Sequence, residues 1–175
     1  MTRDVRQQMI ELLPRMRRFA YSLTGSMDEA DDVVQSACER ALGRLEQFTA
    51  GTRLDSWMFR IVQTTWIDRR RYERRRMHDS DDGIAETAGF DARISESTEA
   101  RMALEIVQRE VARLPEEQRL VLSLVTIEGM TYQEAADVLG IPTGTVMSRL
   151  ARARKRLAEA IDRPGDKAEI RVGAP

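Results

Sequence analysis

The chain has 175 residues and a mass of 20.0 kDa, which allows one ordinary domain or two small ones and excludes a large multidomain enzyme. Its 28 Lys and Arg residues nearly balance its 29 Asp and Glu residues, so the formal net charge is -1. A function that depends on charge must therefore depend on where the charges lie along the chain. One cysteine and one histidine cannot form an internal disulfide or a Cys/His zinc site, and we expect neither a metal nor another cofactor.

The composition predicts a folded protein of the cytoplasm. Hydrophobic residues make up 42% of the chain, which is typical of a globular protein. No apolar run approaches the roughly 18 residues of a membrane span, and residues 1–14 lack the apolar core of a signal peptide. We therefore expect no membrane insertion.

The first 45 residues are predicted to form two amphipathic helices, because their apolar residues recur at helical spacing. Between the helices Gly25 is a stop signal, and Ser26 and Glu29 have the spacing of a capping box. Cys38 lies on the apolar face of the second helix, and we interpret it as a small core residue rather than a redox sensor.

A third apolar stripe contains Trp57 and Trp66 and runs into residues 69–76, which hold six arginines and one glutamate. A tryptophan in an amphipathic stripe more often packs than binds a ligand, so we place Trp66 in the core. Trp57 is left open between packing and ligand contact. The arginine run is either a solvated helix face or a surface for a polyanion.

Residues 77–100 reverse the charge, with seven acidic residues and one arginine. So polar a segment cannot bury enough apolar surface to offset the entropy of ordering it. We predict an all-α protein of two small helical domains, residues 1–76 and 101–163, joined by a flexible acidic linker, residues 77–100, and followed by a tail, residues 164–175. The single histidine, His78, lies in this predicted linker and is given no role.

Helical spacing resumes after residue 103, and Pro115 can open a further helix. Residues 131–157 then have the pattern of a helix-turn-helix. Thr131 and Glu134 have capping-box spacing, and Gly140 can take the left-handed turn between the helices. The second helix has one narrow apolar stripe and a basic remainder, which suits DNA or, alternatively, an ordinary solvated face.

These motifs resemble bacterial RNA polymerase sigma factors of the extracytoplasmic-function (ECF) group. Residues 131–157 resemble the family's fourth conserved region, including the core GTVMSRL at residues 144–150. Residues 28–35 (DEADDVVQ) and 57–69 (WMFRIVQTTWIDR) resemble its second region. The resemblance covers roughly residues 12–161, in the family's order. Thr64 stands where the family usually has Asn, and Met147 stands where many relatives have Arg.

The resemblance implies a transcription initiation factor without catalysis, whose partners are core RNA polymerase, promoter DNA and an anti-sigma factor. The polymerase contacts would be the clamp coiled coil of the largest subunit and the flap of the second largest. The clamp-binding residues would be Asp31, Asp32, Gln35 and Glu39. The residues that recognise and open the minus-10 element would be Phe48, Arg53, Trp57, Arg60, Gln63, Thr64, Arg69 and Arg70. The minus-35 residues would be Thr143, Thr145, Met147, Ser148, Arg149, Arg152 and Lys155.

Two other functions compete with this one. A sigma-like decoy would sequester an anti-sigma factor without binding DNA, but it would need neither the arginine run nor the basic last helix. A stand-alone helix-turn-helix regulator would leave the N-terminal motifs without a role. We further expect two domains that move independently, with apolar stripes near residues 9–23 and 120–125 left exposed for an anti-sigma factor to cover.

Overall fold

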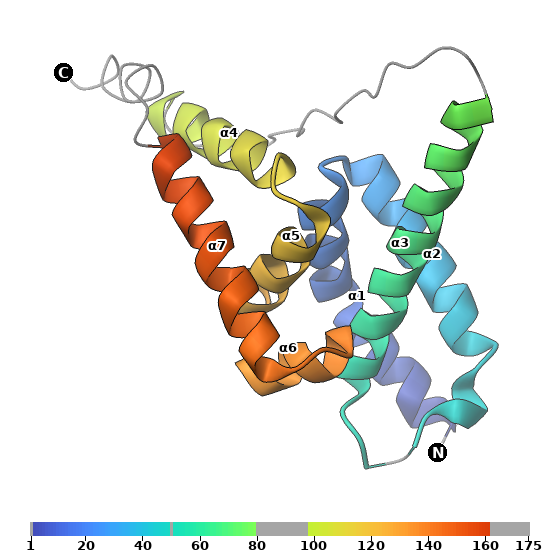
Figure 1. Ribbon diagram of the computed structural model, residues 1–175. Coiled ribbons are helices and arrows are strands. Elements are labelled where there is room, and N and C mark those ends of the chain that lie inside the picture. Colours follow the sequence, from blue (N-terminus) through green and yellow to red (C-terminus); the bar gives the residue numbers. More distant parts are fainter. Residues whose placement is uncertain (1, 50, 80–97, 162–175) are drawn as a thin grey trace.

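The computed structural model describes residues 2–49, 51–79 and 98–161, and every regular element within these ranges is helical (Figure 1). The N-terminal half contains α1 (Thr2–Thr24), α2 (Met27–Leu42), the short 3-10 turn η1 (Leu45–Gln47) and α3 (Leu54–Asp79). The C-terminal half contains α4 (Thr98–Ala112), α5 (Glu116–Leu122), the π-helical turn η2 (Ser123–Ile127), α6 (Tyr132–Leu139) and α7 (Thr143–Ile161). The predicted all-α class with two helical domains is confirmed.

In the N-terminal half, α1, α2 and α3 pack on one another as a three-helix bundle. Its centre holds Phe19 and Phe59, whose rings meet edge to face with centroids 5.2 Å apart. Trp66 is 2% exposed, which confirms its predicted place in the core. At the start of α2 the structure contains the Ser26 half of the predicted capping box. The Ser26 hydroxyl accepts a hydrogen bond from the Glu29 backbone N–H at 3.4 Å.

Cys38 is half-buried and packs against this core. Burial, and after it the charge of neighbouring Glu39, raises the pKa of its thiol. A raised pKa keeps the thiol protonated at neutral pH, where it reacts slowly.

Both neighbouring helices extend into the range predicted as a linker, since α3 continues to Asp79, and so includes His78, and α4 begins at Thr98. The arginine run extends the helix beyond its apolar stripe, since arginine is a good helix former even without packing. Residues 80–97, which make up most of the predicted linker, and residues 162–175, which include the predicted tail, lie outside the described residues.

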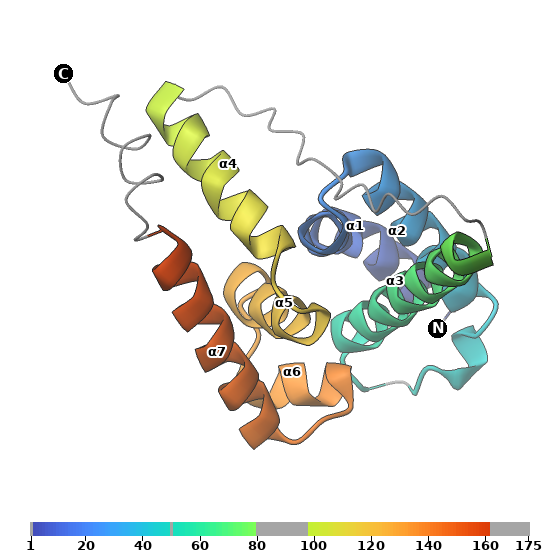
Figure 2. The same cartoon turned by 45° about the horizontal axis from the view of Figure 1, so that its top comes forward.

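The helix-turn-helix of the C-terminal half is built as its sequence predicts. Thr131 and Glu134 form the reciprocal capping box at the start of α6. Gly140 ends α6 with φ 65°, a left-handed conformation that other residues adopt only at a cost. The turn sends α7 along the outer edge of the molecule, and Val146, Leu150 and Ala153 bury its apolar stripe (Figure 2).

The two halves are in contact, and one apolar core runs through both. The stripes near residues 9–23 and 120–125 are therefore not exposed, and that expectation is wrong: Phe19 and Leu124, for example, have no exposed surface. The helix α1 packs on η2 and α5, and α3 packs on α6. Each half thus covers apolar surface of the other, which amphipathic patterns alone cannot reveal because they do not say which partner a face meets.

Candidate nucleic-acid interface

The predicted polymerase-binding residues lie together on the exposed side of α2. Asp31 accepts two hydrogen bonds of 2.6 Å from Arg17 of α1, and Asp32 lies 3.2 Å from Arg69 of α3. Gln35 and Glu39, one turn further along, are hydrogen-bonded to each other at 3.1 Å. The face is acidic, and each of its two aspartates already has an arginine within the same half.

An aromatic pair marks the loop before α3. The rings of Phe48 and Trp57 are tilted with their centroids 5.3 Å apart, and both side chains are half-buried against the core. The sequence leaves Trp57 open between packing and ligand contact. Its side chain is half-buried, so it packs against the core and still keeps accessible surface. Such a pair offers a stacking surface at the start of α3.

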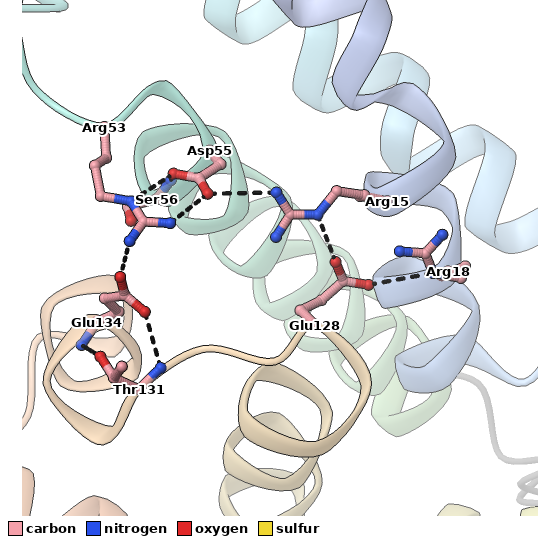
Figure 3. A network of polar contacts seen from close by, with 8 residues as sticks. All are labelled: Arg15, Arg18, Arg53, Asp55, Ser56, Glu128, Thr131 and Glu134. Atoms are coloured by element: carbon pink, nitrogen blue, oxygen red, sulfur yellow. Dashed lines mark hydrogen bonds and ion pairs between the residues drawn. The ribbon is translucent and has the colours of Figure 1, made fainter.

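Two predicted minus-10 arginines are held by the C-terminal half. Arg53 forms an ion pair with Glu134, and it also binds Asp55 at 2.7 Å and 3.1 Å (Figure 3). Arg60 donates to the backbone carbonyls of Asp137 and Val138, at the end of α6. The hydrogen bond from Arg53, with help from Ser56 and Arg15, lowers the pKa of Asp55, although burial opposes the shift.

The remaining predicted minus-10 residues are dispersed along α3. Gln63 is only 9% exposed, and the Thr64 hydroxyl donates to the Arg60 and Ile61 carbonyls at 3.0 Å each, as is common for threonine inside a helix. Arg69 is engaged by Asp32 and by Glu73 at 3.2 Å each, whereas Arg70 is exposed. The structure thus does not gather all of these side chains on one accessible surface.

Four of the seven predicted minus-35 residues are exposed on α7 and are called the α7 row, whereas Thr143, Thr145 and Arg149 are half-buried. Met147 is 53% exposed, and Ser148, Arg152 and Lys155 are also exposed. The contacts of the minus-35 residues stay within the C-terminal half. Arg149 pairs with Glu117 at 2.7 Å, and Lys155 pairs with Glu159 at 3.8 Å. The Thr143 hydroxyl lies 3.0 Å from the Gln133 amide oxygen, and the Ser148 hydroxyl donates to the Thr145 carbonyl at 3.1 Å. In both views α7 lies at the edge of the molecule away from α3, with α6 between them (Figures 1 and 2).

Sequence reasoning missed the residues that join the halves. Glu128 has a fully buried side chain and pairs with Arg15 at 3.0 Å and with Arg18 at 3.6 Å (Figure 3). Arg119 donates to the Leu23 carbonyl at 2.8 Å and lies over the Trp66 ring at 5.8 Å. Burial lowers the pKa of Arg119, with the charge of Arg70 as a lesser cause.

Two protein-family models match the chain. The model described as Sigma-70 region 2 matches residues 9–76, and the one described as Sigma-70, region 4 matches residues 104–157. The ECF RNA polymerase sigma factor EcfG of Rhodopseudomonas palustris (strain TIE-1) is 34% identical over 158 residues, which cover 90% of this chain and 85% of that protein. The chain belongs to the ECF sigma factors, a family of non-catalytic transcription initiation factors.

Solved structures agree with this assignment. The sigma factor RpoE of Bartonella quintana, in complex with the anti-sigma factor NepR, matches with a TM-score of 0.78 and 31% identity, over 91% of this chain and 99% of that one. CnrH, in complex with the cytosolic domain of CnrY, matches with a TM-score of 0.67 and 26% identity, over 93% of this chain and 90% of that one. The decoy alternative is not favoured. Among the described residues, no helix has the length and apolarity that a membrane span requires.

Proposed function

We propose that this sigma factor binds core RNA polymerase through α2 and reads its promoter with α3 and α7. The observation that supports this most directly is the exposed acidic face of α2 on one half and the exposed basic row of α7 on the other. The proposed domains are residues 1–76 and 101–163, and the proposed place of action is the cytoplasm, where RNA polymerase works.

The face of α2 suits a basic partner. Asp31, Asp32 and Glu39 supply carboxylates within about two turns of helix, and Gln35 supplies an amide. Complementary charge sets the register and speed of association more than the final affinity. We assign the clamp coiled coil of the largest polymerase subunit to this face, and the flap of the second largest subunit to the C-terminal half.

The two DNA surfaces have separate tasks. The row on α7 combines Arg152 and Lys155 for phosphates with Ser148 and Met147 for base edges, as a recognition helix in a major groove requires. The loop before α3 combines the Phe48–Trp57 pair with Arg53 and Arg60, which would stack an extruded base and bind the adjacent backbone of the minus-10 strand.

An anti-sigma factor is the proposed regulator. The support comes from two relatives of similar fold, RpoE and CnrH, whose structures contain NepR and the cytosolic domain of CnrY. A helical partner that packs between or around the two halves would hold them together and block the Asp31 surface.

Run-off transcription tests the proposal. Purified protein added to core polymerase and fragmented genomic DNA should give discrete transcripts that core polymerase alone does not make. The protein alone should bind the same DNA weakly, because each half offers one small surface and the net charge is -1. Tight promoter binding without polymerase, together with no transcripts, would show a stand-alone regulator instead.

A further inference from the structure

The junction between the halves contains a network of charged groups whose partners are far apart in the sequence. We call the contacts of Arg15, Arg18 and Arg53 with Glu128 and Glu134 the interdomain network (Figure 3). All three arginines belong to the N-terminal half, and both glutamates belong to the C-terminal half. Closing the two halves therefore brings opposite charges together.

The network is built on groups with fixed positions. The Glu128 side chain is completely buried and accepts a 3.0 Å hydrogen bond from Arg15. Glu134 is held by the α6 capping box, in which it accepts a hydrogen bond from the Thr131 backbone N–H at 2.8 Å. Its other oxygen remains free to receive Arg53. A guanidinium binds a carboxylate with the same fork that it uses for a phosphate, so Glu134 occupies Arg53 as a DNA phosphate would.

A second contact engages Arg60. The carbonyls of Asp137 and Val138 lie in the last turn of α6, where no further helical N–H is available and the helix dipole is negative. Arg60 donates to both. The same helix α6 thus engages both of the arginines that the proposed function assigns to minus-10 DNA at the start of α3.

The shared apolar core and further polar contacts complete the closed arrangement. The buried hydroxyls of Ser22 and Ser123 lie 2.8 Å apart across the junction, and Arg119 caps the end of α1 through the Leu23 carbonyl. The partly exposed pair of Arg53 and Glu134 is weak, and the cost of burying Glu128 offsets much of its attraction to Arg15 and Arg18, so the charged contacts leave the closure reversible. Water can solvate each charged group again when the halves separate.

The size of the closed form also indicates that the halves must separate on promoter DNA. By their names, the minus-35 and minus-10 elements are centred about 25 base pairs apart, which is about 85 Å along duplex DNA. A compact chain of 175 residues has a radius of gyration of about 16 Å. The closed form is too small to lie on both elements at once.

From these observations, and resting on the proposed function of Arg53 and Arg60, we infer that the closed arrangement is self-inhibited. Glu134 and the end of α6 hold the minus-10 arginines, Arg53 and Arg60, until the halves separate, while Glu128 joins the halves through Arg15 and Arg18. The exposed faces of α2 and α7 stay accessible in the closed form, so polymerase and minus-35 DNA can engage first and favour opening.

The test replaces both glutamates by their neutral isosteres in the full-length chain. The variant Glu128→Gln with Glu134→Gln loses both charges but keeps an oxygen for the capping box. The matched control is Glu11→Gln with Glu110→Gln, which removes two charges that bond only within their own halves. Small-angle X-ray scattering should show a larger radius of gyration for the first variant only.

The second measurement is binding of a fluorescein-labelled oligothymidine of 20 nucleotides, followed by anisotropy. The open variant should bind it roughly five-fold or more tightly than the control does. Replacing Arg53 and Arg60 by Gln should weaken binding strongly in the open variant and little in the wild type, where both arginines are already occupied. Comparing the wild type, the open variant and the two arginine-substituted forms is a double-mutant cycle. It separates the release of Arg53 and Arg60 from a general effect of net charge on DNA binding.

Each outcome decides the inference. An unchanged radius of gyration with control-like binding would overturn it, as would opening without a gain in binding. The scattering result does not depend on the proposed function, whereas absence of transcripts from the wild type with core polymerase would contradict that function alone. If the double variant does not fold, Glu134→Gln alone should still give smaller increases in the radius of gyration and in the affinity for oligothymidine. The Glu134 side chain is 25% exposed, whereas that of Glu128 is fully buried, so the single variant disturbs the core less.

Discussion

The proposed minus-10 and minus-35 surfaces have similar chemistry, since each contains arginine or lysine side chains on a helix, and they differ in what those side chains contact. On α7, Arg149 and Lys155 pair within their own half, so the recognition helix is accessible whether or not the halves touch. At the start of α3, Arg53 and Arg60 pair across the junction. We infer from this comparison that the availability of a cation for DNA depends on which half of the chain holds its partner, and not on its exposure alone.

The largest expected effect comes from a variant that cannot bind core polymerase, because neither the minus-10 nor the minus-35 surface then acts in transcription. Reversing charge on the α2 face, with Asp31→Arg and Asp32→Arg, should abolish binding to core polymerase and therefore transcription from any promoter. The fold should lose about 1–2 kcal/mol, because both positions are exposed but each reversal replaces an ion pair by a like charge beside Arg17 or Arg69. Native gel shift with purified core polymerase measures the binding.

The matched control for this variant reverses two exposed acidic residues of α1, with Asp4→Arg and Glu11→Arg. It should bind core polymerase as the wild type does. Equal affinity for the α2 variant and this control would place the polymerase contact elsewhere on the chain.

The next prediction isolates the minus-35 surface. Replacing Arg152 and Lys155 by Ala should strongly reduce promoter-directed transcription and leave the radius of gyration unchanged, since neither side chain reaches the other half. Each lost phosphate contact should also lower the salt dependence of DNA binding by about one in log–log slope.

Arg154→Ala with Arg156→Ala is the control on the same helix, with the same change of charge outside the predicted row. This control should retain most of the activity. If both double variants were equally weak, α7 would act through overall charge and not through a defined recognition face.

A smaller effect concerns the turn that orients α7. Gly140→Ala places a side chain on a backbone with φ 65° and should cost about 1 kcal/mol, although no atom blocks the added carbon. That corresponds to a fall in melting temperature of about 2–4 °C for a chain of this length. Circular dichroism measures it. Gly144→Ala, inside α7 with equally open surroundings, should not lower the melting temperature.

The helices and the turn were predictable because their signals are local. Capping residues three positions apart, a glycine after the last helical residue and apolar spacing of three to four residues specify α6 and α7 without reference to the rest of the chain. The minus-35 assignment came from the resemblance to the family's fourth region and stays a prediction.

The junction was not predictable, because its pairs are distant in sequence. Arg15 and Glu128 are separated by 113 positions, and nothing in either local pattern selects the other. The amphipathic stripe of α1 specifies a buried face but not that η2 and α5 help to cover it. Independent domains were therefore expected, and the structure has them joined through one core.

The smallest expected effect is the pH dependence of Asp55, which links Arg53 to Arg15. Its carboxyl pKa is lowered in the folded chain, so its contribution to stability is present above its ordinary pKa near 3.8 and is lost as the pH falls below that value. The variant Asp55→Asn should therefore lose less stability than the wild type between pH 6 and pH 3. Urea unfolding at the two pH values measures the difference, and an identical loss would show that the arginines do not favour the charged carboxylate.

Distance measurement between the halves tests the central claim most directly. Spin labels on cysteines at Arg71 of α3 and Ala158 of α7, both exposed, are introduced with Cys38→Ser, and double electron–electron resonance reads the distance. We expect one short, narrow distance in the free protein and a longer one when Glu128 and Glu134 are replaced by Gln. A long, broad distribution in the free protein, unchanged by those replacements, would contradict that claim.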